Sequence, residues 1–331
     1  MSKLYNVSAS PHTRSRTTTA TIMQDVIIAL IPATIYGIFN FGIKAFLIIL
    51  TSVVACVMTE YIYEKAMKKP LTTGDYSAVV TGLLLALNLS PNVPLWIPVI
   101  GSVFAILVVK MLYGGIGQNF MNPALAARCF LLISFAGRMN NFAVEQVQVS
   151  GSVPKIFQYL NKGIVAVDGV TGATPLASLR AGESVDLLNL FIGKHGGTIG
   201  ETSVAAILIG AAYLLLRKVI TWRIPVTYLA SFALFLILFG GKGLDWNFLF
   251  SHLFGGGLML GAFFMATDYT TSPRLTTGKI VFGIGCGLIT MIIRLYGSYP
   301  EGVSFSILLM NILTPQIDML FRRKTYGGVK A

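Results

Sequence analysis

The sequence predicts an all-α protein that crosses the membrane many times, with about ten transmembrane helices. Of its 331 residues, 54% are hydrophobic and only 11% are charged, and the mean hydropathy is +0.73. A soluble domain carries far more charge than this. Apolar runs recur along the chain, most of them close to the roughly 20 residues that a helix needs to cross a bilayer. We therefore expect a polytopic membrane protein embedded in lipid.

The apolar runs differ in length, which bears on how each one crosses the membrane. The third and the fifth run are shorter than a full span, so we expect tilted or broken half-helices at these two places. The ten runs lie at about 23–41, 44–63, 76–90, 95–113, 121–136, 202–217, 224–240, 247–267, 279–297 and 303–320.

Positive charge sets the predicted topology. If both termini are cytoplasmic, sixteen of the 25 Lys and Arg residues fall in inner segments and seven in outer segments, while Arg128 and Arg294 lie within spans. Because Lys and Arg concentrate on the cytoplasmic side, we expect cytoplasmic termini and an extracytoplasmic loop at 137–201. The same clusters account for the net charge of +12, so we expect no nucleic-acid partner.

The two halves of the sequence resemble each other. Ser90-Pro91 recurs as Ser272-Pro273, and Leu112-Tyr113 recurs as Leu295-Tyr296, at separations of 182 and 183 residues. Five predicted spans separate equivalent points, so the halves must cross the membrane in opposite directions. Inverted repeats of this kind are typical of transporters, whose sites lie at broken helices near the interface between the repeats.

The repeats divide the chain into three regions. We expect a first five-helix repeat at 1–136, an extracytoplasmic loop at 137–201 and a second five-helix repeat at 202–331. Two inverted repeats of five helices, some of them short or broken, fit a urea-transporter-like fold. On this architecture alone, a solute channel or a secondary transporter is one functional hypothesis, because the fold does not settle function.

The fifth apolar run begins with a glycine-rich stretch and two asparagines. The glycines of 114–117 allow the backbone to approach a ligand closely, and Asn119 and Asn122 follow three residues apart. At a helix start this spacing places both amides on one face, where their donors and acceptors suit the polar edge of a flavin. The alternative is structural: Asn122 caps a helix that begins with Pro123.

A polar motif, broken by glycine, lies in the long loop at Asp168-Gly169-Val170-Thr171-Gly172-Ala173-Thr174. A threonine hydroxyl is a weak nucleophile without a base or a metal beside it, so chemistry at Thr174 needs an external enzyme. The small residues Gly172 and Ala173 leave room for such an enzyme, and Pro175 favours an extended backbone before it. The alternative is an ordinary surface turn, in which Gly and Thr are common.

Metal and haem sites find no support in the pattern of cysteines and histidines. Cys56, Cys129 and Cys286 each stand alone in apolar segments, so neither a disulfide framework nor an iron–sulfur spacing can be built from them. His252 is the one histidine inside a hydrophobic segment, which excludes a bis-histidine haem and favours a core histidine. We expect no metal site.

Five charged residues lie in or beside the predicted spans. Charges in the membrane are costly and are candidates for function, and a proton or Na⁺ path could use the carboxylates among them. The alternative is that water reaches those near span ends and that each arginine pairs with a carboxylate or a carbonyl. The five residues are Asp25, Glu60, Arg128, Asp268 and Arg294.

Several segments together resemble the RnfD/NqrB family of membrane flavoproteins. The resemblance covers nearly the whole chain, and its one visible departure is Thr171, where serine is more common. NqrB-type subunits usually have a longer N-terminal extension, so the chain is most similar to the D subunit of an Rnf-type ferredoxin:NAD⁺ oxidoreductase. The resemblance rests on the loop motif 168–174, the fifth-run motif 114–125, Gly200-Glu201-Thr202-Ser203, the run 264–273 and the segment 299–311.

The resemblance implies two flavins. A transferase would attach FMN through a phosphoester to Thr174, and Asp168, Thr171, Gly172 and Ala173 would form the rest of its acceptor motif. Asn119 and Asn122 would line a non-covalent riboflavin site near the cytoplasmic face. Flavins suit electron transfer because they handle single electrons and pairs.

The resemblance also implies partners and a cellular place. The chain would lie in a bacterial inner membrane, in a complex that couples electron flow between ferredoxin and NAD to Na⁺ or H⁺ translocation. Its partners would be the other Rnf subunits, including an extracytoplasmic subunit that carries FMN and subunits with iron–sulfur clusters. A purely structural scaffold is a third hypothesis, under which Thr174 stays unmodified.

Overall fold

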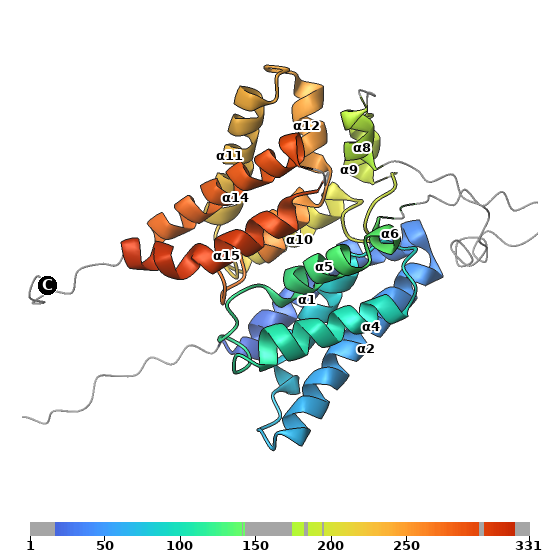
Figure 1. Ribbon diagram of the computed structural model, residues 1–331, viewed down its shortest axis with the longest axis vertical. Helices are drawn as coiled ribbons and strands as arrows, with labels where there is room; N and C mark the ends of the chain where they lie inside the picture. Colours follow the sequence, from blue (N-terminus) through green and yellow to red (C-terminus); the bar gives the residue numbers. More distant parts are fainter. Residues whose placement is uncertain are drawn as a thin grey trace, which may run out of the picture.

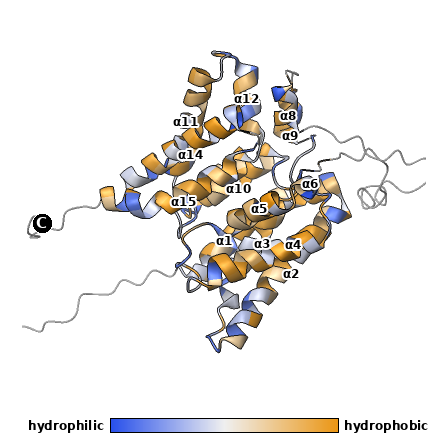
Figure 2. Ribbon diagram, in the orientation of Figure 1, coloured by the Kyte–Doolittle hydropathy of each residue, from blue (hydrophilic) through white to orange (hydrophobic). Residues whose placement is uncertain are grey.

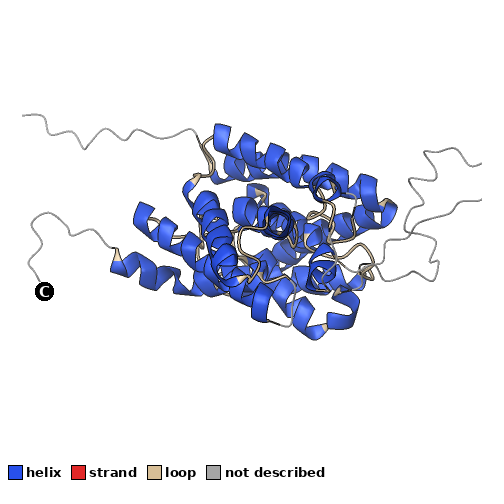
Figure 3. Ribbon diagram, turned by 90° about the horizontal axis from the view of Figure 1, so that it is seen from above, coloured by secondary structure: helices blue, strands red, loops and turns tan. Residues whose placement is uncertain are grey.

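The computed structural model describes residues 17–140, 142, 174–181, 185–193, 195–297 and 301–321. Within these ranges every regular element is a helix (Figure 3). The first half contains α1 (Thr19–Phe41), α2 (Ile43–Ala66), η1 (Thr73–Asp75), α3 (Ser77–Leu87), α4 (Trp96–Val103), η2 (Phe104–Met111), α5 (Pro123–Ser134) and α6 (Ala136–Met139). The remainder contains α8 (Pro175–Arg180), α9 (Leu187–Ile192), α10 (Val204–Leu216), α11 (Arg223–Phe239), α12 (Trp246–Phe254), α13 (Leu258–Leu260), η3 (Gly261–Met265), α14 (Thr276–Tyr296) and α15 (Val303–Leu320).

Each of the ten predicted apolar runs forms helix, which confirms the all-α prediction. By length and composition, α1, α2, α14 and α15 can each cross a membrane, and the bent pair Trp246–Phe254 and Leu258–Met265 makes a fifth candidate span. The other five runs form apolar helices of 10–17 residues. The helices therefore support a membrane protein with four or five candidate spans, and the arrangement of ten spans as inverted repeats stays a prediction.

The helices expose apolar side chains outward, as lipid contact requires. On α1 the exposed residues Ile28, Ile31, Ile35 and Phe39 follow one another at helical spacing, and Figure 2 shows that hydrophobic residues predominate along most helices. Soluble monomers rarely expose contiguous apolar patches of this kind. The exposed apolar stripe of α1 therefore fits a bilayer rather than water.

The breaks in the long apolar runs have identifiable local causes. The run predicted at 247–267 bends by 60° between α12 and α13, where Gly256 and Gly257 have φ of 70° and 66°. These positive angles suit glycine and cannot continue a helix. The fifth run yields a short helix because α5 starts only at Pro123, which cannot donate the backbone hydrogen bond of a helix interior.

The two halves of the chain form two groups of helices that meet along a shared seam. Figure 1 shows α2 to α5 together in the lower part of the molecule and α11, α12, α14 and α15 in the upper part. Contacts between α1 and α10 and between α5 and α15 join the two groups. A continuous apolar core runs through both.

Glycines bring the long helices α11 and α14 into close contact. A Cβ at Gly283 would overlap Thr227 Oγ1, and one at Gly287 would overlap Ser231 Oγ and lie 2.8 Å from the backbone N of Phe232. Spaced four residues apart, the two glycines form the small-residue pattern with which membrane helices pack closely. Hydroxyl side chains and backbone atoms of α11 occupy the space that side chains at these glycines would take.

We expect Gly287→Ala to lower the thermal midpoint of the detergent-solubilised protein, because overpacking against backbone costs about 1–3 kcal/mol. Gly285→Ala is the matched control on the same helix. Its new Cβ would meet the side chain of Met310 at 2.5 Å, and methionine can move aside. Equal losses of stability in the two variants would contradict this account of the helix contact.

Candidate functional site

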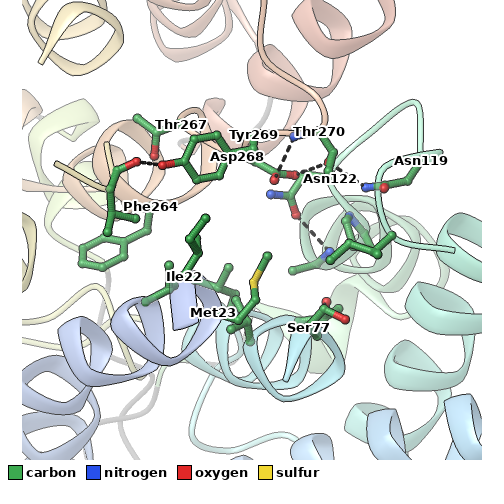
Figure 4. Close-up of a pocket in the computed structure, with 18 of the residues that line it drawn as sticks. Ile22, Met23, Ser77, Asn119, Asn122, Phe264, Thr267, Asp268, Tyr269 and Thr270 are labelled. Atoms are coloured by element: carbon green, nitrogen blue, oxygen red, sulfur yellow. Dashed lines mark hydrogen bonds between the residues drawn. The ribbon is translucent and has the colours of Figure 1, made fainter. Parts of the chain in front are cut away.

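Asn119 and Asn122 line one pocket between the two halves of the molecule. The pocket encloses about 780 Å³ of space between its atoms, its open mouth included. Figure 4 shows the polar side chains of Asn119, Asn122, Asp268 and Thr270 on one side, opposite Ile22 and Met23 of α1. Its walls also include Ser77, Val80, Thr81, Leu84, Lys110, Leu214, Val219, Phe264, Thr267 and Tyr269.

Asn119 lies in the turn that precedes α5. The turn is built on glycines with positive φ at 114, 115 and 117, which lead the chain from η2 back toward the pocket. The Asn119 Nδ2 group donates to the carbonyl of Met121 at 3.3 Å and to Thr270 Oγ1 at 3.1 Å. Its carboxamide oxygen receives no hydrogen bond from the residues that the structure describes, so it is available as an acceptor for a ligand.

Asn122 is the N-cap of α5, which confirms the structural alternative for this residue. Its Oδ1 accepts hydrogen bonds from the backbone N–H groups of Ala124 at 3.0 Å and Leu125 at 3.3 Å, and Pro123 occupies the first helical position. The prediction that Asn119 and Asn122 share a helix face is therefore wrong, because the helix begins after both. They still meet in the pocket, and the Nδ2 group of Asn122 donates to the carbonyl of Met265 at 3.5 Å.

The second half supplies the connection between η3 and α14 to the same pocket. Asp268 accepts hydrogen bonds from the backbone N–H of Thr270 at 3.3 Å, from Thr270 Oγ1 at 3.0 Å and from Thr271 Oγ1 at 3.3 Å. Burial raises the pKa of the Asp268 carboxyl, and these hydrogen bonds oppose the rise. Tyr269 donates its hydroxyl to the carbonyl of Val219, which fixes the loop against the end of α10.

The pocket roles of Thr267, Tyr269 and Thr270 were not predicted from the sequence. The signal for them was the unusual polar run 264–273, which follows an apolar segment and precedes Ser272-Pro273. What the sequence could not give was its pairing with Asn119, which lies 151 residues away from Thr270.

A buried ion pair borders the pocket. Lys110 Nζ lies 2.6 Å from Glu60 Oε1 and 2.6 Å from Ser77 Oγ, and Lys110 and Glu60 are almost wholly buried. Lys110 and Ser77 both line the pocket. Glu60, one of the five charged residues in or beside the predicted spans, therefore has a direct partner inside the protein.

Thr174 lies away from this pocket, at the start of α8. Thr174 is 9% exposed and is the N-cap of α8. Its Oγ1 accepts a long hydrogen bond of 3.4 Å from the backbone N–H of Ala177. Within the described chain the hydroxyl donates to no atom, so an ester at Oγ1 would remove no donated hydrogen bond. Asp168, Thr171, Gly172 and Ala173 lie outside the described residues.

Charged residues gather at the same end of the molecule as Thr174. Arg128 donates to Glu301 and to Ser304 Oγ at 2.7 Å, as in the alternative in which each arginine pairs with a carboxylate or a carbonyl. Glu201 is buried in the connection before α10 and accepts from Thr198 Oγ1 at 3.0 Å. Burial, followed by the nearby Glu301, raises the pKa of the Glu201 carboxyl, and Arg128 opposes that rise.

The other charged candidates also have partners. Asp25 accepts from Tyr213 Oη at 2.9 Å and pairs with Arg217 at 3.2 Å, while Arg294 donates only to backbone carbonyls among the described residues. His252 is buried in α12, as predicted for a core histidine. Cys56, Cys129 and Cys286 are buried free thiols.

The pocket and Thr174 lie at opposite ends of α14. The pocket residues end at Thr270, shortly before Thr276 opens that helix, whereas α8 reaches the carbonyl of Gly297 just after its last turn. A helix of 21 residues is about 30 Å long at roughly 1.5 Å per residue. The two predicted flavin sites therefore lie near opposite ends of a helix that is long enough to cross a bilayer core.

Comparison with known proteins decides the family. A family model described as "NQR2, RnfD, RnfE family" matches residues 6–327 of the chain. The chain belongs to this family. It is 50% identical over 329 residues to the D subunit of the Na(+)-translocating ferredoxin:NAD(+) oxidoreductase complex of Acetobacterium woodii, an alignment that covers 98% of this chain and 96% of that protein.

Other relatives of the NQR2, RnfD, RnfE family also match over nearly their whole length. The D subunit of the proton-translocating ferredoxin:NAD(+) oxidoreductase complex of Clostridium ljungdahlii is 40% identical over 336 residues, covering 98% of this chain and 96% of that protein. The D subunit of the ion-translocating oxidoreductase complex of Halorhodospira halophila is 37% identical over 342 residues, covering 97% and 95%. The resemblance drawn from the sequence is thereby confirmed.

Proposed function

We propose that the chain is the D subunit of an Rnf-type complex, an integral membrane electron-transfer subunit that couples electron flow between ferredoxin and NAD to ion translocation. The observation that supports this most directly is the near full-length similarity to proteins that carry this subunit's name. Those relatives are named for Na⁺ in one case and for protons in the other. The coupling ion of this chain is accordingly Na⁺ or H⁺.

The proposed architecture consists of two inverted repeats of five helices, as in a urea-transporter-like fold, in a bacterial inner membrane. Equivalent helices of the two halves contact each other in the pairs α1 with α10 and α5 with α15, which is consistent with a two-fold axis between the halves. With cytoplasmic termini, the pocket lies toward the cytoplasm and Thr174 on the extracytoplasmic side. The separation of the two sites along α14 supports this assignment.

Riboflavin is the proposed ligand of the pocket. The residues there fit its polar edge: Asn119 offers a carboxamide oxygen that no described residue hydrogen-bonds, and Asn122 and Asp268 add an amide and a carboxyl. The apolar side chains of Ile22, Met23 and others opposite them suit a flat ring system. A flavin bound here supplies one- and two-electron chemistry, while the residues position it and exclude water.

FMN is the proposed modification of Thr174, joined by a phosphoester through the action of a flavin transferase. The fit at this residue rests on the hydroxyl proton, which is not engaged within the described chain. The partners on this side would be the extracytoplasmic subunit that carries FMN, with the iron–sulfur subunits elsewhere in the complex.

We expect the tether to survive denaturation, because a phosphoester is covalent whereas a bound flavin dissociates. The full chain, co-produced with a flavin transferase, should fluoresce yellow-green on a denaturing gel. Thr174→Ala should abolish this fluorescence, and the matched variant Thr171→Ala should retain most of it. Undiminished fluorescence of the Thr174→Ala chain would refute the attachment site.

The topology makes a separate prediction about accessibility. A cysteine placed at Ser178 on α8 should react with a membrane-impermeant thiol reagent added to whole cells, and one placed at the exposed Thr221 should not. The three native cysteines are buried, which keeps their background low. Labelling at Thr221 and protection at Ser178 would invert the model of the membrane orientation.

The riboflavin pocket predicts a selective loss of extractable flavin. Asn119→Leu should leave the ring's polar edge buried without a partner, at a cost of about 1–3 kcal/mol, or roughly ten- to a hundredfold in affinity. Asn122→Asp keeps the oxygen that caps α5 and removes the amide donor, so it tests the second contact without unfolding the helix. Covalent FMN at Thr174 should be unchanged in both.

Acid-extractable flavin, measured per folded chain, decides this prediction. Asn122→Leu serves as the comparison, since it removes the cap as well and should cost about 1 kcal/mol of stability in addition. If Asn119→Leu and Asn122→Asp bind extractable flavin at the wild-type level, the pocket is not the riboflavin site and Asn122 is a helix cap alone.

A further inference from the structure

The helix that carries Thr174 is fastened to the end of α14 by an arginine. Arg180 Nη2 donates to the carbonyls of Arg294 at 2.7 Å and Gly297 at 3.1 Å, with a longer bond of 3.5 Å to Ile293. The last carbonyls of a helix have no partner within the helix, and a cation there also complements the helix dipole. Arg180 therefore caps α14 from another segment of the chain.

A second arginine continues the connection from α14 to α12. The side chain of Arg294 is 2% exposed, and its guanidinium donates to the carbonyls of His252, of Gly255 at 2.9 Å and of Gly256 at 3.1 Å. These carbonyls lie at the end of α12 and in the break before α13. A guanidinium can serve several carbonyls at once because its five N–H groups form a rigid planar fork.

Leu176 of α8 packs against the same break between α12 and α13. A Cβ at Gly256 would overlap Leu176 Cδ1 and would lie 2.5 Å from Arg294 Nη2, and one at Gly255 would lie 3.4 Å from Leu176 Cγ. Leu176 is 2% exposed, so it occupies the space that side chains at these glycines would take. The contacts thus run from α8 to α14, from α14 to α12, and from α12 back to α8.

We propose that Arg180 and Arg294 form a clamp that fixes the position of Thr174, and with it the flavin attached there. The inference rests on the proposed attachment of FMN, which it extends by naming two positioning residues. A helix of six residues is not stable by itself in solution, so its place must come from docking. Leu176 docks one end of α8 and Arg180 the other, with Thr174 directly before the docked residues.

The buried Arg294 is not explained by an ordinary ion pair. Among the residues with described positions, no carboxylate lies within 4.0 Å of its guanidinium, and like Arg180 it donates to backbone carbonyls at a helix end. Such a network positions backbone segments and takes no part in the redox chemistry of the flavin. Catalytic groups must be held within a fraction of an ångström by packing and hydrogen bonds around them.

The clamp is tested by a spin label at Ser178→Cys on α8, in the full chain with the buried native cysteines in place. Arg180→Gln should increase the mobility of the label, because the carbonyls of α14 lose their donor. Arg180→Lys, with a single donor group, should give an intermediate mobility. Arg138→Gln is the matched control, an exposed arginine in the last turn of α6, and should leave the label as it is in the parent.

Two further measurements separate the clamp from the attachment. In-gel fluorescence should be the same for Arg180→Gln and the parent, while electron transfer through the assembled complex should fall by about ten- to a hundredfold, as for a misplaced reacting group. A label that stays as immobile in Arg180→Gln as in the parent overturns the clamp. A parent chain without covalent flavin overturns the attachment instead, and the label mobility still decides the clamp.

Discussion

The guanidinium of Arg294 holds the broken helix α12–α13 in place, and the packing of α8 after Thr174 depends on it. A helix that breaks in an apolar layer leaves carbonyls that water cannot reach, and each must find a donor within the protein. Arg294 supplies donors to three of them, and its charge lies 5.1 Å from the centre of the Phe232 ring, which attracts cations. Removing the Arg294 side chain would leave these buried carbonyls without donors, at a cost of about 1–3 kcal/mol for each.

The first half also buries a cation, Lys110, in a helix that has a counterpart in the second half. This residue belongs to the helix that follows Ser90-Pro91, as Arg294 belongs to the helix that follows Ser272-Pro273, so each half places one buried cation on its corresponding helix. The partners differ: Lys110 meets a carboxylate, Glu60, and a hydroxyl, whereas Arg294 meets carbonyls. One of the two cations lies beside the pocket and the other beside α8.

The sequence predicted every apolar helix and missed most of the contacts between them. Periodicity and length locate helices because burial and lipid contact act along the whole segment. The break in 247–267 depends on the φ of Gly256 and Gly257, and a triple glycine only permits such a turn. Of the pocket residues, the sequence identified Asn119 and Asn122. The prediction that the two share a helix face was wrong, because α5 starts at Pro123, after both. Their pairing with 267–270 is a long-range contact that no local pattern encodes.

The two proposed flavin sites use different physics to hold a similar ring. In the pocket, position comes from shape and hydrogen bonds, and the cap at Asn122 fixes the backbone on which Asn119 and its neighbours stand. At Thr174 a covalent bond replaces affinity by effective concentration, but a flexible tether fixes distance without fixing orientation. The orientation must then come from the segment that bears the tether. Because α8 is docked at Leu176 and at Arg180, the chain itself limits where a group on Thr174 can go, and a deep pocket is not needed there.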